Sequence, residues 1–517
     1  AISMSKTIII IGAGLAGLSA ALQAAENGCN VKLVSSLPSE RAQSVMAEGG
    51  INAALNTKDE NDSPEEHFTD TIKAACGLAD PNAVWGMTQA APELVHWLLK
   101  LGVKFNMSGY DDVDLRNFGG QKKKRTAFAQ SDTGKQIMTA MIDAVRRKEA
   151  SGMVERFSHH SFLTLRLCGN ICCGCVIRDE YSQETVELPG DAVIVATGGM
   201  HGLFGNTTGS LSNTGEVTAE LFRLGVPLAN GEMIQYHPTT VKCGGKRMLI
   251  SEAARGEGGR LFAMKDGKQW YFMEEKYPEL GNLMPRDITA REIWKVSHES
   301  EVFLDMTEIS EEIISNKLSG LADDCMTYLH KDIRKEPVSV LPGIHYFMGG
   351  ILVDEQHRTP IQNLYAAGEC CAQYHGANRL GGNSLLGALY GGRVAAKSAC
   401  EQADVVDLSC ATQIDFPPAS QISEIKQLNK VMQETMGVVR NENTLLNGIQ
   451  TVQALTGNLP LLGMAVLKSA LARKESRGAH WREDYPKSND DDYLKTTVAR
   501  FDGKQIQISF VPVPERR

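Results

Sequence analysis

The segment from residue 6 to residue 36 constrains the fold of this chain most strongly, because it combines a strand, a glycine turn, a helix and a second strand. A β-branched run at 6–11 predicts a buried strand, and an alanine-rich helix should end near Gly28 before a second strand at 29–36. The turn holds Gly12, Ala13, Gly14, Leu15, Ala16 and Gly17. These glycines allow a tight turn, the approach of a pyrophosphate and close packing of helix on strand. The segment therefore predicts a dinucleotide-binding βαβ unit.

Two later segments indicate which dinucleotide is bound. Residues 191–199 predict an apolar strand that ends in Ala196-Thr197-Gly198, and residues 361–369 predict another that ends in Gly368-Glu369. Either one alone is typical of an ordinary turn in an α/β sheet, but flavoproteins with two dinucleotide-binding halves carry both. The acidic residue expected after the second strand is replaced by Ser35 and Ser36, so ribose recognition should come partly from elsewhere. FAD is the cofactor that this combination predicts.

Size and charge narrow the class of protein. A length of 517 residues is typical of roughly three domains. The net charge of −9 argues against a nucleic-acid-binding protein, which usually carries a basic surface. We interpret the one basic run, Lys122–Arg125, as a solvated loop; a docking patch for an acidic partner or a substrate-steering site are the alternatives. We expect no transmembrane helix, because glycines interrupt the longest apolar stretch.

The cysteines are expected to be buried thiols. Four of the 12 lie close together, at Cys168, Cys172, Cys173 and Cys175, around a Gly-Asn turn. We interpret this segment as a β-hairpin in which small thiols pack in the core, and we predict no metal site. Free thiols of this kind are typical of a reducing compartment, which predicts a cytoplasmic protein.

A glycine-rich segment near residue 380 raises a further question. Residues 375–392 place one arginine, Arg379, among many small residues. Glycine at such density indicates close approach of the backbone to another group, and a cation beside it can hold an anion. We expect Gly381, Gly382 and Ser384 to bring this loop close to the flavin, with Arg379 directed at a bound substrate.

Ordered motifs along nearly the whole chain resemble one family, the flavoprotein subunits of succinate dehydrogenase and fumarate reductase, to which L-aspartate oxidase is related. The matching segments are 46–55, 118–128, 235–239, 251–259, 285–292, 345–350, 375–386 and 476–486. The resemblance implies an α/β fold: a Rossmann-like FAD domain of the two-dinucleotide-binding type, an inserted α+β capping domain and a short C-terminal helical region. The implied boundaries are 4–230 with 350–415 for the FAD domain, 231–349 for the cap, 416–485 for the helices and 486–517 for a tail.

The resemblance also implies how a C4 dicarboxylate such as fumarate would be held. His237, His345 and Arg379 are the expected clamps, and Arg379 offers a planar fork that matches a carboxylate. Ser251 adds a hydroxyl donor where the family more often has threonine. Polarising the carboxylate also stabilises charge on the adjacent carbon, which is worth roughly 3–4 kcal/mol for one preorganised donor. Taken alone, each histidine would more often be a buried structural residue.

The expected proton donor is unusual. By resemblance, Arg286 delivers the proton, and Glu252 and Arg255 relay a replacement. Nearby cations should weaken the hold of Arg286 on its proton, and the three-residue spacing puts Glu252 and Arg255 on one helical face. The sequence alone favours a structural ion pair between Arg286 and Asp287 at a helix start, whereas the resemblance favours the catalytic role.

The remaining expected contacts are to FAD. They are Gly12, Ala13, Gly14, Ala16, Gly17, Ser35, Ser36, Ser44, Ala47, Gly49, Gly50, Ala196, Thr197, Gly198, Glu216, Gly368, Glu369, Arg379, Ser384 and Leu385. Glu216 stands where the family commonly has aspartate. Gln43 stands where membrane-complex members carry the histidine that links FAD covalently, so we predict non-covalent FAD. Without that link the flavin should favour fumarate reduction.

These features predict a fumarate reductase flavoprotein subunit whose reaction can also run in reverse, as in a succinate dehydrogenase. L-aspartate oxidase is one alternative, and a flavin-dependent assembly or electron-transfer subunit without a substrate site is another. The sequence has no haem-attachment or ferredoxin-type cysteine pattern, so electrons should come from a partner such as an iron–sulfur subunit. The membrane would then be reached only through partner subunits, which would place the chain at the inner membrane as a peripheral component.

Overall fold

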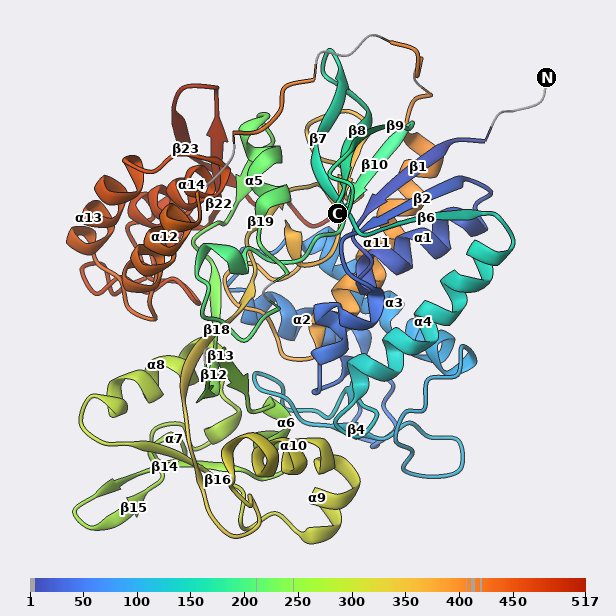
Figure 1. Cartoon of the computed structure of the whole chain (residues 1–517). Coiled ribbons are helices and arrows are strands. Elements are labelled where there is room, and N and C mark those ends of the chain that lie inside the picture. Colours follow the sequence, from blue (N-terminus) through green and yellow to red (C-terminus); the bar gives the residue numbers. More distant parts are fainter. Residues whose placement is uncertain (1–4, 211, 245, 406, 411–413, 419–420) are drawn as a thin grey trace.

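A five-stranded parallel sheet organises the first part of the computed structural model, which describes residues 5–210, 212–244, 246–405, 407–410, 414–418 and 421–517 (Figure 1). Its order is β20-β10-β1-β2-β6. The strands are β1 (Thr7–Ile11), β2 (Asn30–Ser35), β6 (Val154–Ser158), β10 (Ala192–Val195) and β20 (Leu364–Ala366). The predicted strands at 6–11, 29–36, 191–199 and 361–369 therefore all lie in one sheet, as the predicted α/β fold requires.

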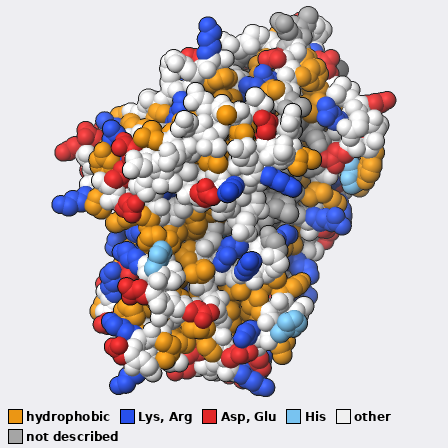
Figure 2. Space-filling model, turned by 60° about the vertical axis from the view of Figure 1, so that its left-hand side comes forward, with side chains coloured by type: hydrophobic (Ala, Val, Ile, Leu, Met, Phe, Trp, Pro, Cys, Tyr) orange, Lys and Arg blue, Asp and Glu red, His pale blue; other side chains and the backbone are white. Residues whose placement is uncertain are grey.

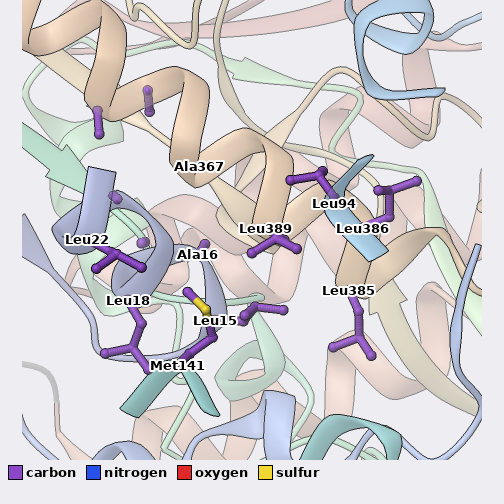
Figure 3. Close-up of a cluster of buried hydrophobic side chains, with 14 of the residues drawn as sticks. Leu15, Ala16, Leu18, Leu22, Leu94, Met141, Ala367, Leu385, Leu386 and Leu389 are labelled. Atoms are coloured by element: carbon purple, nitrogen blue, oxygen red, sulfur yellow. The ribbon is translucent and has the colours of Figure 1, made fainter. Parts of the chain in front are cut away.

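Helices α1 (Leu15–Glu26) and α11 (Asn383–Gln402) pack against each other beside this sheet, and Figure 3 shows side chains of both helices, such as Leu18 and Leu389, in one buried cluster. Their small residues allow the contact to be close. A Cβ on Gly392 would collide with the backbone oxygen of Ala16, and one on Gly17 would collide with that of Gly12. Gly12 itself has φ +112°, a conformation that favours glycine. These glycines thus serve the turn and the packing predicted for them.

Further elements surround the sheet. The helices are α2 (Pro64–Ala74), α3 (Pro81–Lys100), α4 (Thr133–Ala150) and α5 (Glu216–Arg223). A short antiparallel sheet contains β3 (Ile51–Asn52), β4 (Leu115–Arg116) and β5 (Thr126–Ala127). Another contains β7 (His160–Cys168), β8 (Ile171–Asp179) and β9 (Thr185–Pro189).

The β7–β8 hairpin confirms one expectation about the cysteines and corrects another. Cys172, Cys173 and Cys175 are buried on β8, as predicted. Cys168 is not a free thiol: it forms a disulfide with Cys410, 242 residues later in the chain. The spacing of the two residues gives no signal of this contact, because only the tertiary fold brings them together.

Residues between 231 and 349 form the yellow-green part of Figure 1. One sheet holds β12 (Ile234–Cys243), β13 (Lys246–Leu249) and β18 (Leu341–Phe347). A second holds β14 (Arg260–Lys265), β15 (Lys268–Trp270), β16 (Val302–Asp305) and β17 (Val338–Ser339). The helices are α6 (Glu252–Gly256), α7 (Phe272–Lys276), α8 (Arg286–Ser297), α9 (Glu311–Lys317) and α10 (Ser319–Asp324). The boundaries proposed for the separate domains stay predictions.

The last part of the chain contains helices and a folded hairpin. The helices are α12 (Ile422–Thr435), α13 (Glu442–Gln453), α14 (Asn458–Ala472) and α15 (Asp490–Tyr493). Strands β22 (Lys495–Phe501) and β23 (Ile506–Pro512) extend a sheet with β11 (Leu228–Ala229), β19 (Gly350–Leu352) and β21 (Cys371–Ala372). The segment that we expected to be a tail is thus paired with strands from the middle of the chain.

The basic run at Lys122–Arg125 is only partly solvated. Lys122 is exposed and pairs with Glu279, but Arg125 is fully buried and donates to Asp62 and Asp70. The interpretation of a solvated loop is therefore wrong for Arg125, whose charge is balanced inside the protein. On the face shown in Figure 2, blue and red side chains are interspersed. Within the described ranges, no helix is both long and apolar enough to cross a membrane.

Candidate active site

A cavity of about 1610 Å³ runs past the carboxyl ends of the parallel strands and reaches the β12–β13–β18 sheet. Every residue predicted to contact FAD lines it except Gly17, which lies behind the turn in the packing contact described above. Of the six predicted catalytic residues, five line the same cavity, and Arg255 does not. The fold thus brings together segments more than 300 residues apart in the chain.

The end of the cavity near α1 fits a dinucleotide. The first turn of α1 faces the cavity, and Ser44 accepts a hydrogen bond from the backbone N–H of Leu15 at 3.2 Å. A helix N-terminus with exposed amides is suited to a pyrophosphate. Ser35 and Ser36 at the end of β2, and Thr197 and Gly198 after β10, line the adjoining wall. Parallel strands bind ligands at this edge.

The two acidic residues expected beside FAD also line the cavity. Glu369 accepts from the backbone N–H of Phe347 at 3.1 Å and lies 3.4 Å from Nε2 of His201. Glu216 is the first residue of α5, and burial, together with the charge of Glu220, raises its pKa. The two carboxylates therefore reach the cavity from different parts of the fold, Glu369 just after β20 and Glu216 at the start of α5.

Arg286 begins α8 and points into a polar cluster. Its Nη2 donates to Oε2 of Glu252 at 3.1 Å, and its Nη1 donates to Oε1 of Gln235 at 3.2 Å. Asp287 pairs instead with Arg291 one turn along the helix. The alternative of an Arg286–Asp287 ion pair is therefore wrong. Arg286 therefore contacts the carboxylate of Glu252 and also lines the cavity.

Glu252 and Arg255 lie on one face of the short helix α6, as their spacing predicts, with Oε1 and Nη2 3.7 Å apart. Both side chains are fully buried. Burial works against ionisation of Glu252, but the guanidinium groups of Arg286 and Arg255 more than compensate and lower its pKa. Burial lowers the pKa of Arg255 to about 10. The three groups form a buried chain in which a carboxylate joins two guanidiniums.

Arg379 is a buried cation without an acidic partner within 4.0 Å in the described part of the chain. Its guanidinium lies 4.3 Å from the centre of the Tyr346 ring, and its Nε has no hydrogen-bond partner there. Burial, and then the charge of Arg286, lowers its pKa to about 9. An unpaired buried guanidinium is costly unless an anion accompanies it, so this position favours an anionic ligand.

His237 on β12 and His345 on β18 lie close together, with ring centres 5.2 Å apart. The backbone N–H of Thr239 donates to Nδ1 of His237 at 3.2 Å, which leaves the proton on Nε2. Nδ1 of His345 lies 2.6 Å from the hydroxyl of Thr208. Burial and the neighbouring arginines hold the pKa of both rings well below the usual value. Both are therefore neutral near pH 7, and Nε2 of His237 is a buried donor without a partner in the structure.

The glycines before α11 have partners that we did not expect. A Cβ on Gly381 would collide with Oε2 of Glu252, and one on Gly382 would collide with the side chain of Asn52. These residues therefore make room for the proposed proton relay and for a buried amide. Gly382, Ser384 and Leu385 still line the cavity. Ser251 lines it too and caps α6 by accepting from the N–H of Ala253.

Sequence reasoning missed several residues that shape this site. Gln235 contacts Arg286 through its oxygen, and its Nε2 donates to the backbone oxygen of Arg379 at 2.8 Å, so it holds both arginines. Thr208 orients His345. Gln235 lies within a recognised motif, but nothing in the pattern distinguishes it from its neighbours. Gln43, which the sequence did single out, accepts from the backbone N–H of Ser210.

Glu48 is another residue that the sequence did not single out. It lines the cavity beside Gly49, and one of its oxygens is buried without a partner in the described residues. Burial, with the charges of Asp324 and Asp132, raises its pKa from 4.5 to about 8. The native protein therefore keeps a proton on Glu48 at pH values where the unfolded chain releases it.

Because the native pKa of Glu48 is raised, its stabilising contribution is full below pH 4.5 and is lost as the pH approaches about 8. The melting temperature of Glu48→Gln should therefore rise relative to that of wild type as the pH increases from about 5 to about 8, because glutamine does not titrate. Differential scanning fluorimetry across this range measures the difference. The exposed Glu434→Gln is the matched control and should show no such trend. A difference between Glu48→Gln and wild type that stays constant with pH would contradict the argument.

Comparisons with known proteins agree with this geometry. The profile of the family described as "FAD binding domain" matches residues 7–385, and that described as "Fumarate reductase flavoprotein C-term" matches residues 455–516. The succinate dehydrogenase flavoprotein subunit of Bacillus subtilis is 38% identical over 576 residues, covering 99% of this chain and 98% of that protein.

Two further relatives extend the comparison. The flavoprotein subunit of the 8-methylmenaquinol:fumarate reductase of Wolinella succinogenes is 32% identical, covering 99% of this chain and 92% of that protein. A solved structure of a FrdA variant from the E. coli quinol fumarate reductase superposes with a TM-score of 0.88 at 26% identity, covering 99% of this chain and 97% of that one. The chain carries an FAD-binding domain and belongs to the family of succinate dehydrogenase and fumarate reductase flavoprotein subunits.

Proposed function

We propose that this chain is the flavoprotein subunit of a fumarate reductase, in which FAD binds non-covalently and fumarate is reduced to succinate. The observation that carries the proposal is the meeting of Arg286, Arg379, His237 and His345 on one cavity that is continuous with the dinucleotide site. Reduction of a dicarboxylate such as fumarate needs hydrogen-bond donors at both ends of the molecule, a hydride source and an acid. The residues of this cavity offer the donors and the acid.

The substrate would be held at its two carboxylates. The guanidinium of Arg379, which has no acidic partner in the described part of the chain, and the ring of His345 suit one carboxylate, with Nε2 protonated if Thr208 donates to Nδ1. The Nε2–H of His237 and the hydroxyl of Ser251 suit the other. Because both histidines are neutral, they donate hydrogen bonds without adding charge. These donors polarise the substrate and stabilise negative charge that develops on the carbon next to a carboxylate.

Reduced FAD, held by the residues of the dinucleotide site, would supply a hydride to one alkene carbon. Arg286 is placed to donate a proton to the other carbon, since it reaches the cavity while Glu252 contacts it from behind. Glu252 can then return a proton to Arg286 and draw on Arg255, which lies deeper and donates to the backbone oxygen of Asn282. The reverse steps would oxidise succinate with the same groups.

Gln43 supports non-covalent attachment and the direction of reduction. A glutamine amide cannot form a histidyl link, and here its oxygen is occupied by the N–H of Ser210. A covalent link tends to raise the flavin potential, which favours succinate oxidation, so its absence favours fumarate reduction. The partner expected to deliver electrons is an iron–sulfur subunit.

Acid denaturation tests the attachment of the flavin. After precipitation of the holoprotein with acid and centrifugation, the yellow colour should stay in the supernatant, because no bond holds FAD to Gln43. The absorbance of both fractions measures the distribution, and an untreated sample spun in parallel should keep its colour with the protein. Flavin that remains in the washed acid pellet would refute the proposal.

Turnover assays separate this function from the alternatives. The isolated holoprotein with reduced viologen should reduce fumarate and show little oxidation of L-aspartate by oxygen. The named relatives are succinate dehydrogenase and fumarate reductase subunits, which also favours this function over L-aspartate oxidase. Turnover of L-aspartate alone would favour the oxidase, whereas no turnover of either substrate would favour an electron-transfer role. Comparing succinate oxidation with fumarate reduction in the same preparation tests the direction.

A further inference from the structure

A second arginine without an acidic partner among the described residues lines the same cavity as the two histidines of the site. Arg247 is on β13 and lines the same cavity. Its Nε donates to the hydroxyl of Thr240 at 2.6 Å, and that hydroxyl in turn donates to the backbone oxygen of Leu341. No carboxylate lies within 4.0 Å of its guanidinium among the residues that the structure describes. The half-buried group is therefore fixed in place by a hydroxyl and keeps its charge unbalanced.

A close approach to Gly343 places Arg247 near the strand position that pairs with His237. His237 is directly opposite Gly343 in the β12–β18 register, and directly opposed residues point to the same face. A Cβ on Gly343 would lie 2.9 Å from Nε of Arg247 and 2.7 Å from the hydroxyl of Thr240. The arginine thus occupies the space that a side chain at position 343 would fill, on the face of the sheet that carries His237.

Burial lowers the pKa of Arg247, and no charged neighbour contributes to this shift. A cation that loses hydration without gaining an acidic partner is poised to bind an anion. The hairpin β12–β13 also carries Lys246 on the cavity wall, while Lys242 on the same hairpin is exposed and lies outside that wall. Arg247 thus lines the same cavity as Arg286 and Arg379.

We propose that Arg247 is a carboxylate-binding residue at the capping side of the cavity, which contacts one end of a bound dicarboxylate and favours dianions over monoanions. The proposal rests on the proposed function for the identity of the substrate. In this arrangement Arg247 contributes to binding rather than to hydride or proton transfer. Its loss should therefore change KM and leave kcat nearly intact.

The test compares wild type with Arg247→Gln, Arg247→Lys and the control Lys242→Gln. Isothermal titration of the holoprotein with malonate measures binding without turnover. Arg247→Gln should weaken malonate binding and raise the KM for fumarate roughly tenfold, as expected for a lost hydrogen bond to a charged group. Arg247→Lys should recover part of this loss. Lys242→Gln should resemble wild type, and the monomethyl ester of fumarate should be affected much less than fumarate.

The outcomes distinguish this proposal from the proposed function. If wild type reduces fumarate and Arg247→Gln keeps wild-type KM and malonate affinity, the role of Arg247 is refuted while the function stands. An equal loss of malonate affinity in Lys242→Gln would also refute the role of Arg247, because the effect would then come from the overall positive charge of the hairpin. If malonate binding depends on Arg247 but fumarate is not reduced, the binding role stands and the proposed function fails.

Discussion

Replacing Arg286 with glutamine should reduce fumarate turnover by about 10²–10⁴-fold while FAD stays bound. Glutamine keeps a donor near Glu252 and Gln235 but has no acidic proton to deliver. The cofactor contacts lie on other residues of the cavity, so flavin content should not change. Steady-state rates with reduced viologen, together with the flavin-to-protein absorbance ratio, measure both effects.

Lys295→Gln is the matched control for this variant. It removes one positive charge from the same helix, α8, where the lysine is half-exposed and pairs with Glu292 at 3.7 Å. Its turnover should match wild type. Normal turnover in Arg286→Gln would remove Arg286 from the acid role, whereas loss of flavin together with activity would show that the variant had damaged the site as a whole.

Replacing Arg473 with methionine should destabilise the protein by about 3–5 kcal/mol, the cost of breaking a buried ion pair. The side chain of Arg473 is fully buried and donates to Glu232 at 2.8 Å and to Glu475 at 2.7 Å. It also donates to the backbone oxygens of Tyr493 and Lys495, and so joins the end of α14 to the start of β22. Methionine would leave Glu232 buried without its cation.

Urea unfolding of the holoprotein, followed by circular dichroism, measures this loss. The matched control is Arg334→Met, which removes an exposed arginine paired with Glu311. Surface pairs contribute about 0–1 kcal/mol, so its unfolding curve should lie close to wild type. Similar curves for Arg473→Met and wild type would show that the buried network does not hold the C-terminal region to the rest of the protein.

The local sequence pattern predicted the strands and the first helix of the parallel sheet well, because each prediction depends on only a few neighbouring residues. The strand, turn and helix around Gly12 follow from β-branched residues, glycine and alanine in sequence order. The same holds for the strands that end at Ala196 and before Glu369. Their assembly into one parallel sheet follows from general rules for such units.

What the sequence could not show depends on contacts between distant segments. In the sequence, Arg125 belongs to a run of basic residues that is typical of a surface. In the fold, it is buried and forms ion pairs with Asp62 and Asp70. Nothing in the local sequence indicates that the C-terminal residues pair in a sheet, since their partner strand, β11, lies more than 260 residues earlier. Gln235 and Arg247 have no local signal either: their roles depend on what the facing strand and loops bring to them.

The candidate catalytic residues came from family resemblance rather than from spacing. Physical reasoning from the sequence alone favoured structural roles for Arg286, His237 and His345. Their convergence on one cavity with Arg379 is a property of the tertiary structure. Glu252 and Arg255 are the exception, because their helical spacing predicted the contact that the fold contains.

A crystal structure of the FAD-bound protein soaked with malonate would test the central claim most directly. The account predicts that the dicarboxylate lies against the isoalloxazine ring, with one carboxylate on Arg379 and His345 and the guanidinium of Arg286 facing its central carbon. An anion bound away from the flavin, or Arg379 and His345 turned away from it, would contradict the account.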